Sequence, residues 1–538
     1  MRKLAACSLM ALMAIGPIPT PAFAQDHDYG STTTPIKHLV VIFGENISFD
    51  HYFGTYPNAT NPKGEPAFHA KSDTPSVNGF TDGLLFSNPN FVNTATNKTG
   101  AANPFRLDRS EAATADQDHG YTPEQEAFHA GLMDSFPAFT GTAGPPPAGS
   151  TQTTKGLVMG YFDGNTVTAL WNYAQRYALN DNAYGTNFGP STPGALNLIT
   201  GQTNGVSDEV NAGGDIVADG QGGTTLISDA DPVGDVCSTT TGATVFMSGQ
   251  NIGDLLNDRG ITWGWFQGGF NLGLTNPNGT TGCKRSHTSS VTGVTETDYI
   301  QHHEPFQYYS STANPKHLRP TTTIGESDQA NHQYDIDDFY TAVNSGHMPA
   351  VSFLKAPGYQ DAHAGYSDPI DEQAFVVSVI NFLEQRPEWK STAVIINYDD
   401  SDGWYDHQMG PIVNQSQTAD DELTGSGQCG SSTNTALAGV TAEHVQGRCG
   451  YGPRIPIIVI SPWAKKNFVD HTVTDQSSIL RFVEDNWLGG QRITGSFDAI
   501  AGTLNNMFDF NNESNGGIYL LDPNTGLVTA DRPGNPGW

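Results

Sequence analysis

The sequence predicts an α/β fold, doubly wound, with a mostly parallel central sheet covered by helices on both faces and interrupted by long loop insertions. Short runs rich in Val, Ile and Leu, bounded by turn residues, are typical of strands that are buried on both faces. Helical patterns lie between these runs, which is the order that produces a parallel sheet. Stretches rich in Gly, Ser, Thr and Asn indicate the insertions.

The predicted strands and helices alternate along the chain. The strands, all expected to be parallel, are His38–Phe43, Ala350–Leu354, Ala393–Tyr398 and Ile455–Ile460. The helices are Ala169–Ala178, Asp337–Val343, Glu372–Gln385 and Ser477–Asn486. Sheets of this kind bind ligands beyond the carboxyl ends of their strands. Polar residues that follow a strand are therefore the first candidates for a site.

One catalytic domain is expected over residues 25–538, because a chain of 538 residues with 37% hydrophobic content can bury one large core. Insertions are expected at about 58–103, 201–295 and 415–448. The tail after Asp509 is expected to form an edge hairpin or to pack on the surface.

Residues 1–24 have the pattern of a signal peptide. Arg2 and Lys3 precede an apolar run from Leu4 to Ile15, and Ala22-Phe23-Ala24 supplies small residues for cleavage. This run is shorter than the ~20 residues that cross a bilayer, so no transmembrane anchor is expected. The protein is therefore expected to be exported, either to the periplasm or to the medium.

Four cysteines remain after the signal peptide, and an even number in an oxidising compartment predicts two disulfides. Three connectivities are possible. We favour Cys237 with Cys283 and Cys429 with Cys449, because each pair lies within its own Gly/Ser/Thr-rich stretch.

The formal net charge is −31, from 56 acidic and 25 basic residues. A surface this negative repels polyphosphates, so no nucleic-acid partner is expected. Phosphate chemistry on this chain would therefore depend on bound cations and on local basic side chains.

Acidic and amide side chains follow two of the predicted strands. Glu45 and Asn46 follow the first, after Gly44, and together offer oxygens for a hard metal ion. The alternative is a strand-to-helix turn in which Asn46 caps a helix. Asp399 and Asp400 follow the strand Ala393–Tyr398, where two adjacent carboxylates favour a cation. The alternative there is a solvated acidic turn.

A hydroxyl and several histidines complete the set of candidates. Ser191 lies in a Gly-Pro-Ser-Thr-Pro-Gly turn before a helical pattern, where it can serve as a nucleophile or simply as a helix N-cap. The histidine clusters are Asp118-His119, His302-His303, Asp361-Ala362-His363 and Asp406-His407. Such clusters can bind metal, contact phosphoryl oxygens or move a proton, whereas a single surface histidine is usually inert.

These motifs resemble the bacterial phospholipase C and acid phosphatase (phosphoesterase) family, a branch of the alkaline-phosphatase-like superfold. Glu45-Asn46-Ile47-Ser48-Phe49-Asp50-His51-Tyr52-Phe53-Gly54 is similar to the opening motif of that family. The resemblance continues in order to about residue 490, through the segments Asp118-His119, Gly189-Pro190-Ser191, His303-Glu304-Pro305-Phe306, Asp361-Ala362-His363, Tyr398-Asp399-Asp400-Ser401-Asp402-Gly403 and Gly452-Pro453-Arg454-Ile455-Pro456.

The resemblance implies an exported, metal-dependent phosphoric-ester hydrolase that acts on a phosphate ester or a phospholipid. The implied metal ligands are Glu45, Asn46, Ser191, Asp399 and Asp400. Ser191 is the implied nucleophile and would form a phosphoserine intermediate. The histidines implied around the phosphoryl group are His119, His302, His303 and His363, with His363 favoured as the proton donor.

The substrate and the metal ion are not fixed by the resemblance. Many phospholipases C of the family have Thr after the Gly-Pro pair, whereas Ser191 is closer to the acid phosphatases, so the substrate preference stays open. The oxygen-rich ligand set suits Ca²⁺, Mg²⁺ or Mn²⁺, although related members of the superfold use Zn²⁺.

Two other functions explain fewer of these residues. A sulfatase-like esterase would have Arg at the fourth position after the nucleophile in a C/S-x-P-x-R context, and Ser191 lacks it. A secreted binding protein stabilised by calcium explains the acidity but not Ser191 or the histidines. Trp263, Trp265, Phe266 and Phe270 are either a contact for the substrate or core residues.

Overall fold

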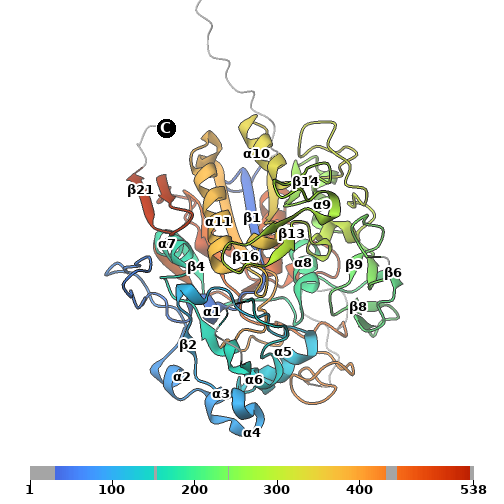
Figure 1. Cartoon of the computed structure of the whole chain (residues 1–538). Helices are drawn as coiled ribbons and strands as arrows, with labels where there is room; N and C mark the ends of the chain where they lie inside the picture. Colours follow the sequence, from blue (N-terminus) through green and yellow to red (C-terminus); the bar gives the residue numbers. More distant parts are fainter. Residues whose placement is uncertain (1–30, 149, 151–153, 240, 432–444, 534–538) are drawn as a thin grey trace, which may run out of the picture.

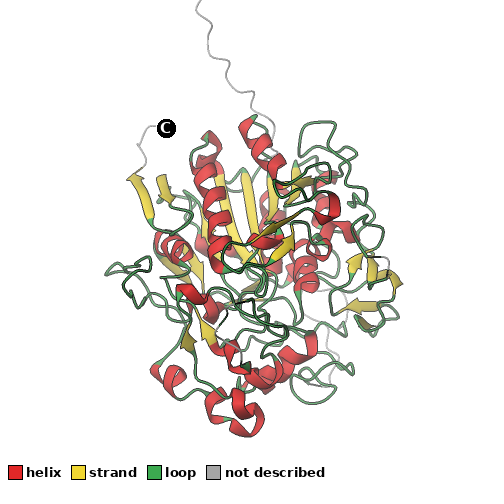
Figure 2. Ribbon diagram, in the orientation of Figure 1, coloured by secondary structure: helices red, strands yellow, loops and turns green. Residues whose placement is uncertain are grey.

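An eight-stranded, mostly parallel sheet forms the centre of the computed structural model, which describes residues 31–148, 150, 154–239, 241–431 and 445–533 (Figures 1 and 2). The strand order is β14-β11-β15-β1-β16-β17-β4-β18. The bounds are β1 His38–Gly44, β4 Ala178–Asn180, β11 Trp263–Gln267, β14 Gln333–Asp335, β15 Val351–Lys355, β16 Thr392–Tyr398, β17 Ile457–Ile460 and β18 Phe468–Asp470. The predicted α/β class is confirmed, and the predicted signal peptide lies outside the described residues.

Three neighbouring strands position the site. β1 pairs in parallel with β15 on one side and with β16 on the other, so that Val41 lies opposite both Phe353 and Ile395. All residues of these three strands are buried, as their continuous apolar runs predict for strands covered on both faces. Their carboxyl ends therefore meet at one edge of the sheet.

The direction of β17 differs from the prediction. It runs antiparallel to both of its neighbours, β16 and β4. The described residues between β16 and β17 contain no helix that could carry the chain back across the sheet. The chain therefore re-enters from the edge at which it left, and β17 points the opposite way.

Four strands of the sheet were absent from the prediction, namely β4, β11, β14 and β18. They have three to five residues each and contain Trp, Tyr, Asn or Asp instead of a continuous Val/Ile run. β11 lies inside the range 201–295, so only parts of that range lie outside the sheet. Its Trp263 and Trp265 are fully buried in the core, which favours the core reading of these aromatic residues over substrate contact.

The predicted helices are present with nearly the expected bounds, and side-chain caps explain where three of the four start. They are α7 Thr168–Arg176, α10 Ile336–Asn344, α11 Pro369–Glu384 and α12 Gln476–Trp487. Asp335, Asp368 and Asp475 accept hydrogen bonds from backbone N–H groups of the first turns of α10, α11 and α12. In Figure 2, α11 lies in front of the central strands.

The segments outside the sheet form separate features. The range 58–103 carries the short helices α2 Asp82–Phe86, α3 Pro89–Val92 and α4 Thr94–Asn97, which lie at the bottom of Figure 1 near α5 Tyr121–Phe128 and α6 Phe136–Phe139. At the other end of the chain, β20 Gly517–Leu521 and β21 Val528–Pro533 form the expected hairpin. It packs on α11, where Asn381 Nδ2 donates to the carbonyl of Leu521 at 2.7 Å.

Both favoured disulfides are present. Cys237 is bonded to Cys283 and Cys429 to Cys449, which confirms that pairing among the three possibilities. Among the helices that the structure describes, none combines the length and the apolar character needed to cross a membrane.

Candidate active site

The five predicted metal ligands come together at the carboxyl edge of the sheet. Glu45 and Asn46 directly follow β1, and Asp399 and Asp400 directly follow β16. Ser191 is the first residue of α8 (Ser191–Thr200). One carboxylate oxygen each from Glu45, Asp399 and Asp400 lies within 4.8 Å of the others, close enough to share one cation.

The hydroxyl of Ser191 points at two of these carboxylates. Its Oγ donates to Glu45 Oε2 at 2.8 Å and lies 3.3 Å from Asp400 Oδ2. Ser191 is only 1% exposed, and it makes no capping bond, because the N-cap position of α8 is Pro190. The interpretation of Ser191 as a helix cap is therefore wrong.

Asn46 adopts a left-handed backbone conformation, with φ of 64°, that turns its side chain into the site. Its N–H donates to Asp399 Oδ1 at 3.0 Å, and its Nδ2 donates to Asp402 Oδ1 at 2.9 Å. Its Oδ1 is buried and has no hydrogen-bond partner among the described residues. The cap of the next helix, α1 (Phe49–Phe53), is Ser48, so Asn46 is not a helix cap.

The unpartnered Asn46 Oδ1 and the buried carboxylates fit a divalent cation. Asp399 and Asp400 are 2% and 3% exposed, so the solvated acidic turn is wrong for them. Burial, together with the charge of Asp399, raises the pKa of Asp400 to about 8. Burial also raises the pKa of Glu45 and of Asp399. A bound cation would stabilise the ionised form of each group.

Two glycines allow the close approach of these elements. A Cβ on Gly194 would lie 2.2 Å from the backbone oxygen of Asp399, so glycine lets the first turn of α8 contact the end of β16. A Cβ on Gly44 would lie 2.7 Å from the ring of Tyr398. Gly44 is therefore required by packing and not by an unusual backbone angle, since its φ is not positive.

The four predicted histidines surround this edge at different depths. His303 Nδ1 lies 3.1 Å from Glu45 Oε1. His119 and His363 face each other at 5.8 Å between ring centroids and belong to one cluster with Asp116 and Asp402. His302 is more exposed, and its Nδ1 lies 3.8 Å from Asp231.

The surroundings give these histidines different charges. Although burial opposes it, the carboxylates of Asp400 and Asp402 raise the pKa of His119 well above its usual value. Burial and then the neighbouring His302 lower the pKa of His303. Burial lowers the pKa of His363. His119 is thus favoured as a cation, and His303 and His363 as neutral imidazoles.

Lys355, the last residue of β15, was absent from the predicted site. Its buried Nζ contacts Glu45 Oε1 and lies 3.5 Å from Asp399 Oδ2. Burial alone would lower the pKa of Lys355, but the charges of Glu45 and Asp399 raise it. The signal was present in the sequence, because Lys355 directly follows the predicted strand Ala350–Leu354.

Glu124 of α5 was also absent from the prediction, and no local pattern marks it. Its two carboxylate oxygens accept hydrogen bonds from the Gly189 N–H at 3.0 Å and from Ser401 Oγ at 2.7 Å. It therefore ties the turn before Ser191 to the loop after β16. Burial raises the pKa of Glu124 to about 8.

The Asp406-His407 cluster serves a structural purpose. Arg454, fully buried, lies 2.9 Å from Asp50 Oδ1 and 3.0 Å from Asp406 Oδ2. His407 Nδ1 lies 2.6 Å from Asp50 Oδ2. These contacts join three motifs that lie far apart in the sequence, and they hold the loops after β1 and β16 to the start of β17.

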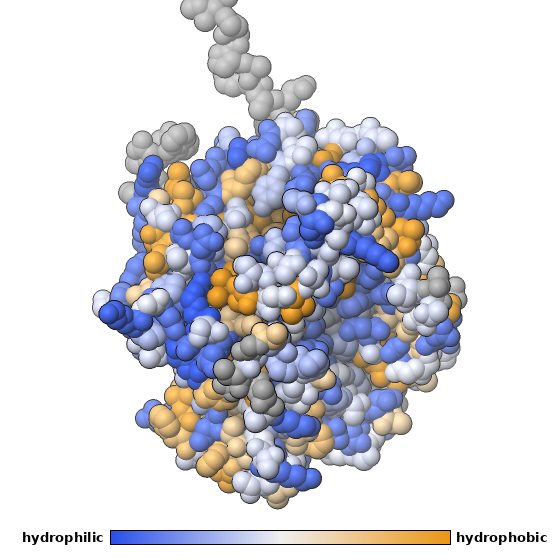
Figure 3. Space-filling view, viewed as in Figure 1, coloured by the Kyte–Doolittle hydropathy of each residue, from blue (hydrophilic) through white to orange (hydrophobic). Residues whose placement is uncertain are grey.

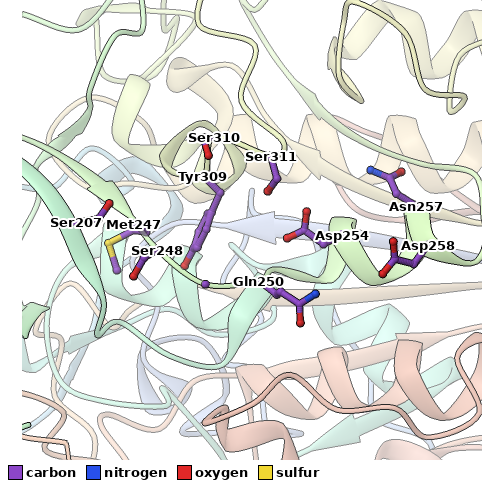
Figure 4. A pocket seen from close by; sticks show the side chains of 11 residues that line it. Ser207, Met247, Ser248, Gln250, Asp254, Asn257, Asp258, Tyr309, Ser310 and Ser311 are labelled. Carbon is purple, nitrogen blue, oxygen red and sulfur yellow. The ribbon is translucent and has the colours of Figure 1, made fainter.

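A cavity lies apart from these residues. It has a volume of about 540 Å³ and is lined by Ser207 and Tyr309 together with residues of α9 (Ile252–Asp258), as Figure 4 shows. Two of its polar side chains are already engaged: Asp254 accepts from the N–H of Asn251, and Asn257 accepts from Trp263 Nε1. None of the predicted site residues lines it.

Glu372, buried behind the site, predicts a pH-dependent stability. It accepts hydrogen bonds from the hydroxyls of Tyr52 and Tyr398, and burial raises its pKa from 4.5 to about 7. The folded state then holds a proton that the unfolded state has lost, so this group reduces the unfolding free energy by about 3 kcal/mol as the pH rises from 4.5 to 7. Glu372→Gln is expected to remove that part of the decline, measured by urea unfolding at pH 5 and pH 8. The same decline in variant and wild type would contradict it.

Comparison with known proteins finds phospholipases C among the relatives of this chain. The non-hemolytic phospholipase C of Pseudomonas aeruginosa is 26% identical over 528 residues, which cover 95% of this chain and 63% of the relative. Phospholipase C B of Mycobacterium tuberculosis is 23% identical over 550 residues, which cover 98% of this chain and 86% of the relative. This chain thus spans less than two thirds of the length of the Pseudomonas protein.

A solved structure of a protein in the alkaline phosphatase superfamily from Vibrio parahaemolyticus aligns over 60% of each chain. Its TM-score is 0.26 at 12% identity, so this likeness adds nothing to the argument from the site. The family comparison is stronger, because it matches residues 36–488, which include every predicted site residue. The chain belongs to the Phosphoesterase family.

Proposed function

We propose that this protein is a divalent-metal-dependent phosphoric-ester hydrolase in which Ser191 is the nucleophile. The observation that carries the proposal is the hydroxyl of Ser191, which lies between Glu45 and Asp400 beside the unpartnered Asn46 Oδ1. Membership of the Phosphoesterase family and the phospholipase C relatives support it.

The metal would be held by Glu45, Asn46, Asp399, Asp400 and the oxygen of Ser191. This set contains only oxygen donors, which suits Mg²⁺, Mn²⁺ or Ca²⁺ better than Zn²⁺. When bound, the cation would lower the pKa of the serine hydroxyl and would place positive charge beside the phosphoryl oxygens.

Ser191 Oγ attacks phosphorus in line with the leaving oxygen, forming the P–Oγ bond as the bond to the leaving oxygen breaks. Its hydroxyl proton would pass to Glu45 Oε2, the oxygen to which it already donates a hydrogen bond. The leaving alkoxide takes a proton from a histidine, and water then cleaves the phosphoserine to release phosphate. Glu124 and Gly194 keep Ser191 aligned, because both fix the start of α8.

The histidines would contact the non-bridging oxygens of the phosphoryl group. His119 is the better proton donor, because its pKa is raised, whereas burial lowers the pKa of His363, which the sequence favoured for this role. His303, held beside Glu45, would act as a neutral donor to a phosphoryl oxygen.

A lipid substrate is the second candidate, and an exposed apolar patch favours it. Phe86 of α2 is 72% exposed, Val92 of α3 67%, and Leu132, between α5 and α6, 58%. These helices lie at the bottom of Figure 1, where the surface in Figure 3 includes orange, hydrophobic residues. Asn90 Nδ2 donates to the carbonyl of Met133 at 2.8 Å, which joins α3 to the segment of Leu132. Apolar side chains grouped on one lobe can insert into a lipid surface.

A substrate panel tests both candidates. Hydrolysis of p-nitrophenyl phosphate and of phosphatidylcholine vesicles is measured with the wild type, with Phe86→Ser/Val92→Ser, and with Leu527→Ser, which removes an exposed apolar side chain at the distant hairpin. For a lipid enzyme, the double variant is expected to lose about tenfold in vesicle activity and to keep its activity on the soluble ester. If no phosphate ester is hydrolysed, the proposed function is wrong.

Export would complete this assignment. The two disulfides are stable in an oxidising compartment and rare in the cytosol. They support the proposal that the protein is exported to the periplasm or to the medium.

A further inference from the structure

Lys355 occupies an unusual position for a lysine. It ends β15, the strand beside β1, and its side chain is fully buried with Nζ 5.0 Å from the ring centroid of Phe43. A buried ammonium is costly unless it is paired, and here it is paired with Glu45 and Asp399. Because a buried ion pair adds little stability over apolar residues of the same size, stability does not explain this lysine.

The lysine and the serine face opposite oxygens of the same carboxylate. Lys355 Nζ contacts Glu45 Oε1, whereas Ser191 Oγ donates to Glu45 Oε2. Asp399 likewise presents Oδ2 to Lys355, and its Oδ1 accepts from the N–H of Asn46. Lys355 therefore fixes the orientation of two predicted metal ligands and leaves the serine side of Glu45 free.

Lys355 balances the charge of the three proposed carboxylate ligands and one divalent ion. Glu45, Asp399 and Asp400 bring three negative charges, and one divalent cation brings two positive charges. The ammonium of Lys355 supplies the third positive charge within contact distance of two of these carboxylates. Without Lys355, these three carboxylates and one divalent ion would together keep one negative charge, which disfavours a phosphate dianion.

We propose that Lys355 is a positioning residue that acts as a fixed second cation of the site: it orients Glu45 and Asp399, neutralises the charge that one divalent ion leaves, and thereby limits the site to a single metal ion. This inference rests on the proposed function, because it assumes a metal held by the same carboxylates. Asp361, the other carboxyl group near Lys355, is engaged by the N–H of His363 and the hydroxyl of Tyr366.

The proposal makes metal binding and catalysis change in opposite directions. Lys355→Met is expected to bind Mn²⁺ about tenfold more tightly, or to take a second equivalent, because one more negative charge stays uncompensated. At saturating Mn²⁺ its kcat for p-nitrophenyl phosphate is expected to fall about 100-fold or more, because Glu45 and Asp399 lose the contact that orients them. A merely structural lysine would instead weaken metal binding and activity together.

The experiment measures Mn²⁺ binding by calorimetry and by metal content after gel filtration at pH 8, with the full chain. Lys355→Gln keeps a hydrogen-bond donor without the charge and is expected to behave in the same way. It provides the same test if the methionine variant folds poorly. Arg454→Met removes a buried cation from the Asp50–Asp406 contact instead, and it is expected to lower stability with an unchanged metal count.

The outcomes separate this inference from the proposed function. The proposed role of Lys355 would be overturned if both Lys355 variants bound one equivalent of Mn²⁺ with unchanged or weaker affinity. The proposed function would still stand in that case, provided that the wild type needs a metal for activity. A wild type that binds no divalent cation would overturn the proposed function, and this inference with it.

Discussion

Ser191→Ala is expected to lower kcat/KM for a phosphate ester by about 10⁴-fold or more, because the variant loses the atom that attacks phosphorus. The loss should not come from misfolding, since Ser191 makes no capping bond and its hydroxyl contacts only Glu45 and Asp400 among the described residues. The far-ultraviolet circular dichroism should stay near that of the wild type.

Ser352→Ala is the matched control. Ser352 is also fully buried, on β15 beside the site, but its hydroxyl has no hydrogen-bond partner in the described part of the chain. It is expected to keep wild-type kcat within a few-fold. Acid quenching during turnover of the wild type should leave phosphate on the peptide that contains Ser191. Full activity of Ser191→Ala, or phosphate on another residue, would remove Ser191 as the nucleophile.

The central strands could be predicted because burial on both faces leaves a direct trace in the sequence. β1 and β16 are runs of Val and Ile with no polar alternation. β4 and β14, with three residues each, carry no such trace, because they are strands only through pairing with a neighbour. The direction of β17 depends on the path of the chain between strands, and a local run of residues does not record that path.

The site could be predicted as far as its residues follow strands or begin a helix. Glu45 and Asp399 occupy such positions, and the sheet brings them together. Lys355 directly follows the predicted strand Ala350–Leu354 too, but an ammonium group is not a metal ligand, so a pattern of oxygen ligands does not include it. Glu124 comes from a segment distant in the sequence, and only packing places it beside the turn that precedes Ser191.

Removal of the metal is expected to abolish activity and also to lower the free energy of unfolding. Protein treated with a chelator and then dialysed should lose about 10³-fold or more in kcat, because the phosphoryl charge then faces three buried carboxylates without a divalent cation. Mg²⁺, Mn²⁺ or Ca²⁺ should restore it. Metal at 100 times its Kd should also raise the unfolding free energy by about 2.7 kcal/mol, since it binds only the folded state.

Asp400→Asn tests whether the effect of the cation comes from binding at this site or from a general effect of divalent ions on the protein. It removes one ligand charge beside Ser191, so it is expected to raise the metal concentration needed for half-maximal activity about 100-fold and to shrink the stabilisation by metal. Asp498→Asn, at a buried aspartate that accepts from the N–H of Ile493 far along the chain, should keep the wild-type metal requirement. If chelation left kcat unchanged, the carboxylates at the ends of β1 and β16 would need another source of positive charge. Among the described residues, Lys355 and the histidines are the basic groups in contact with them.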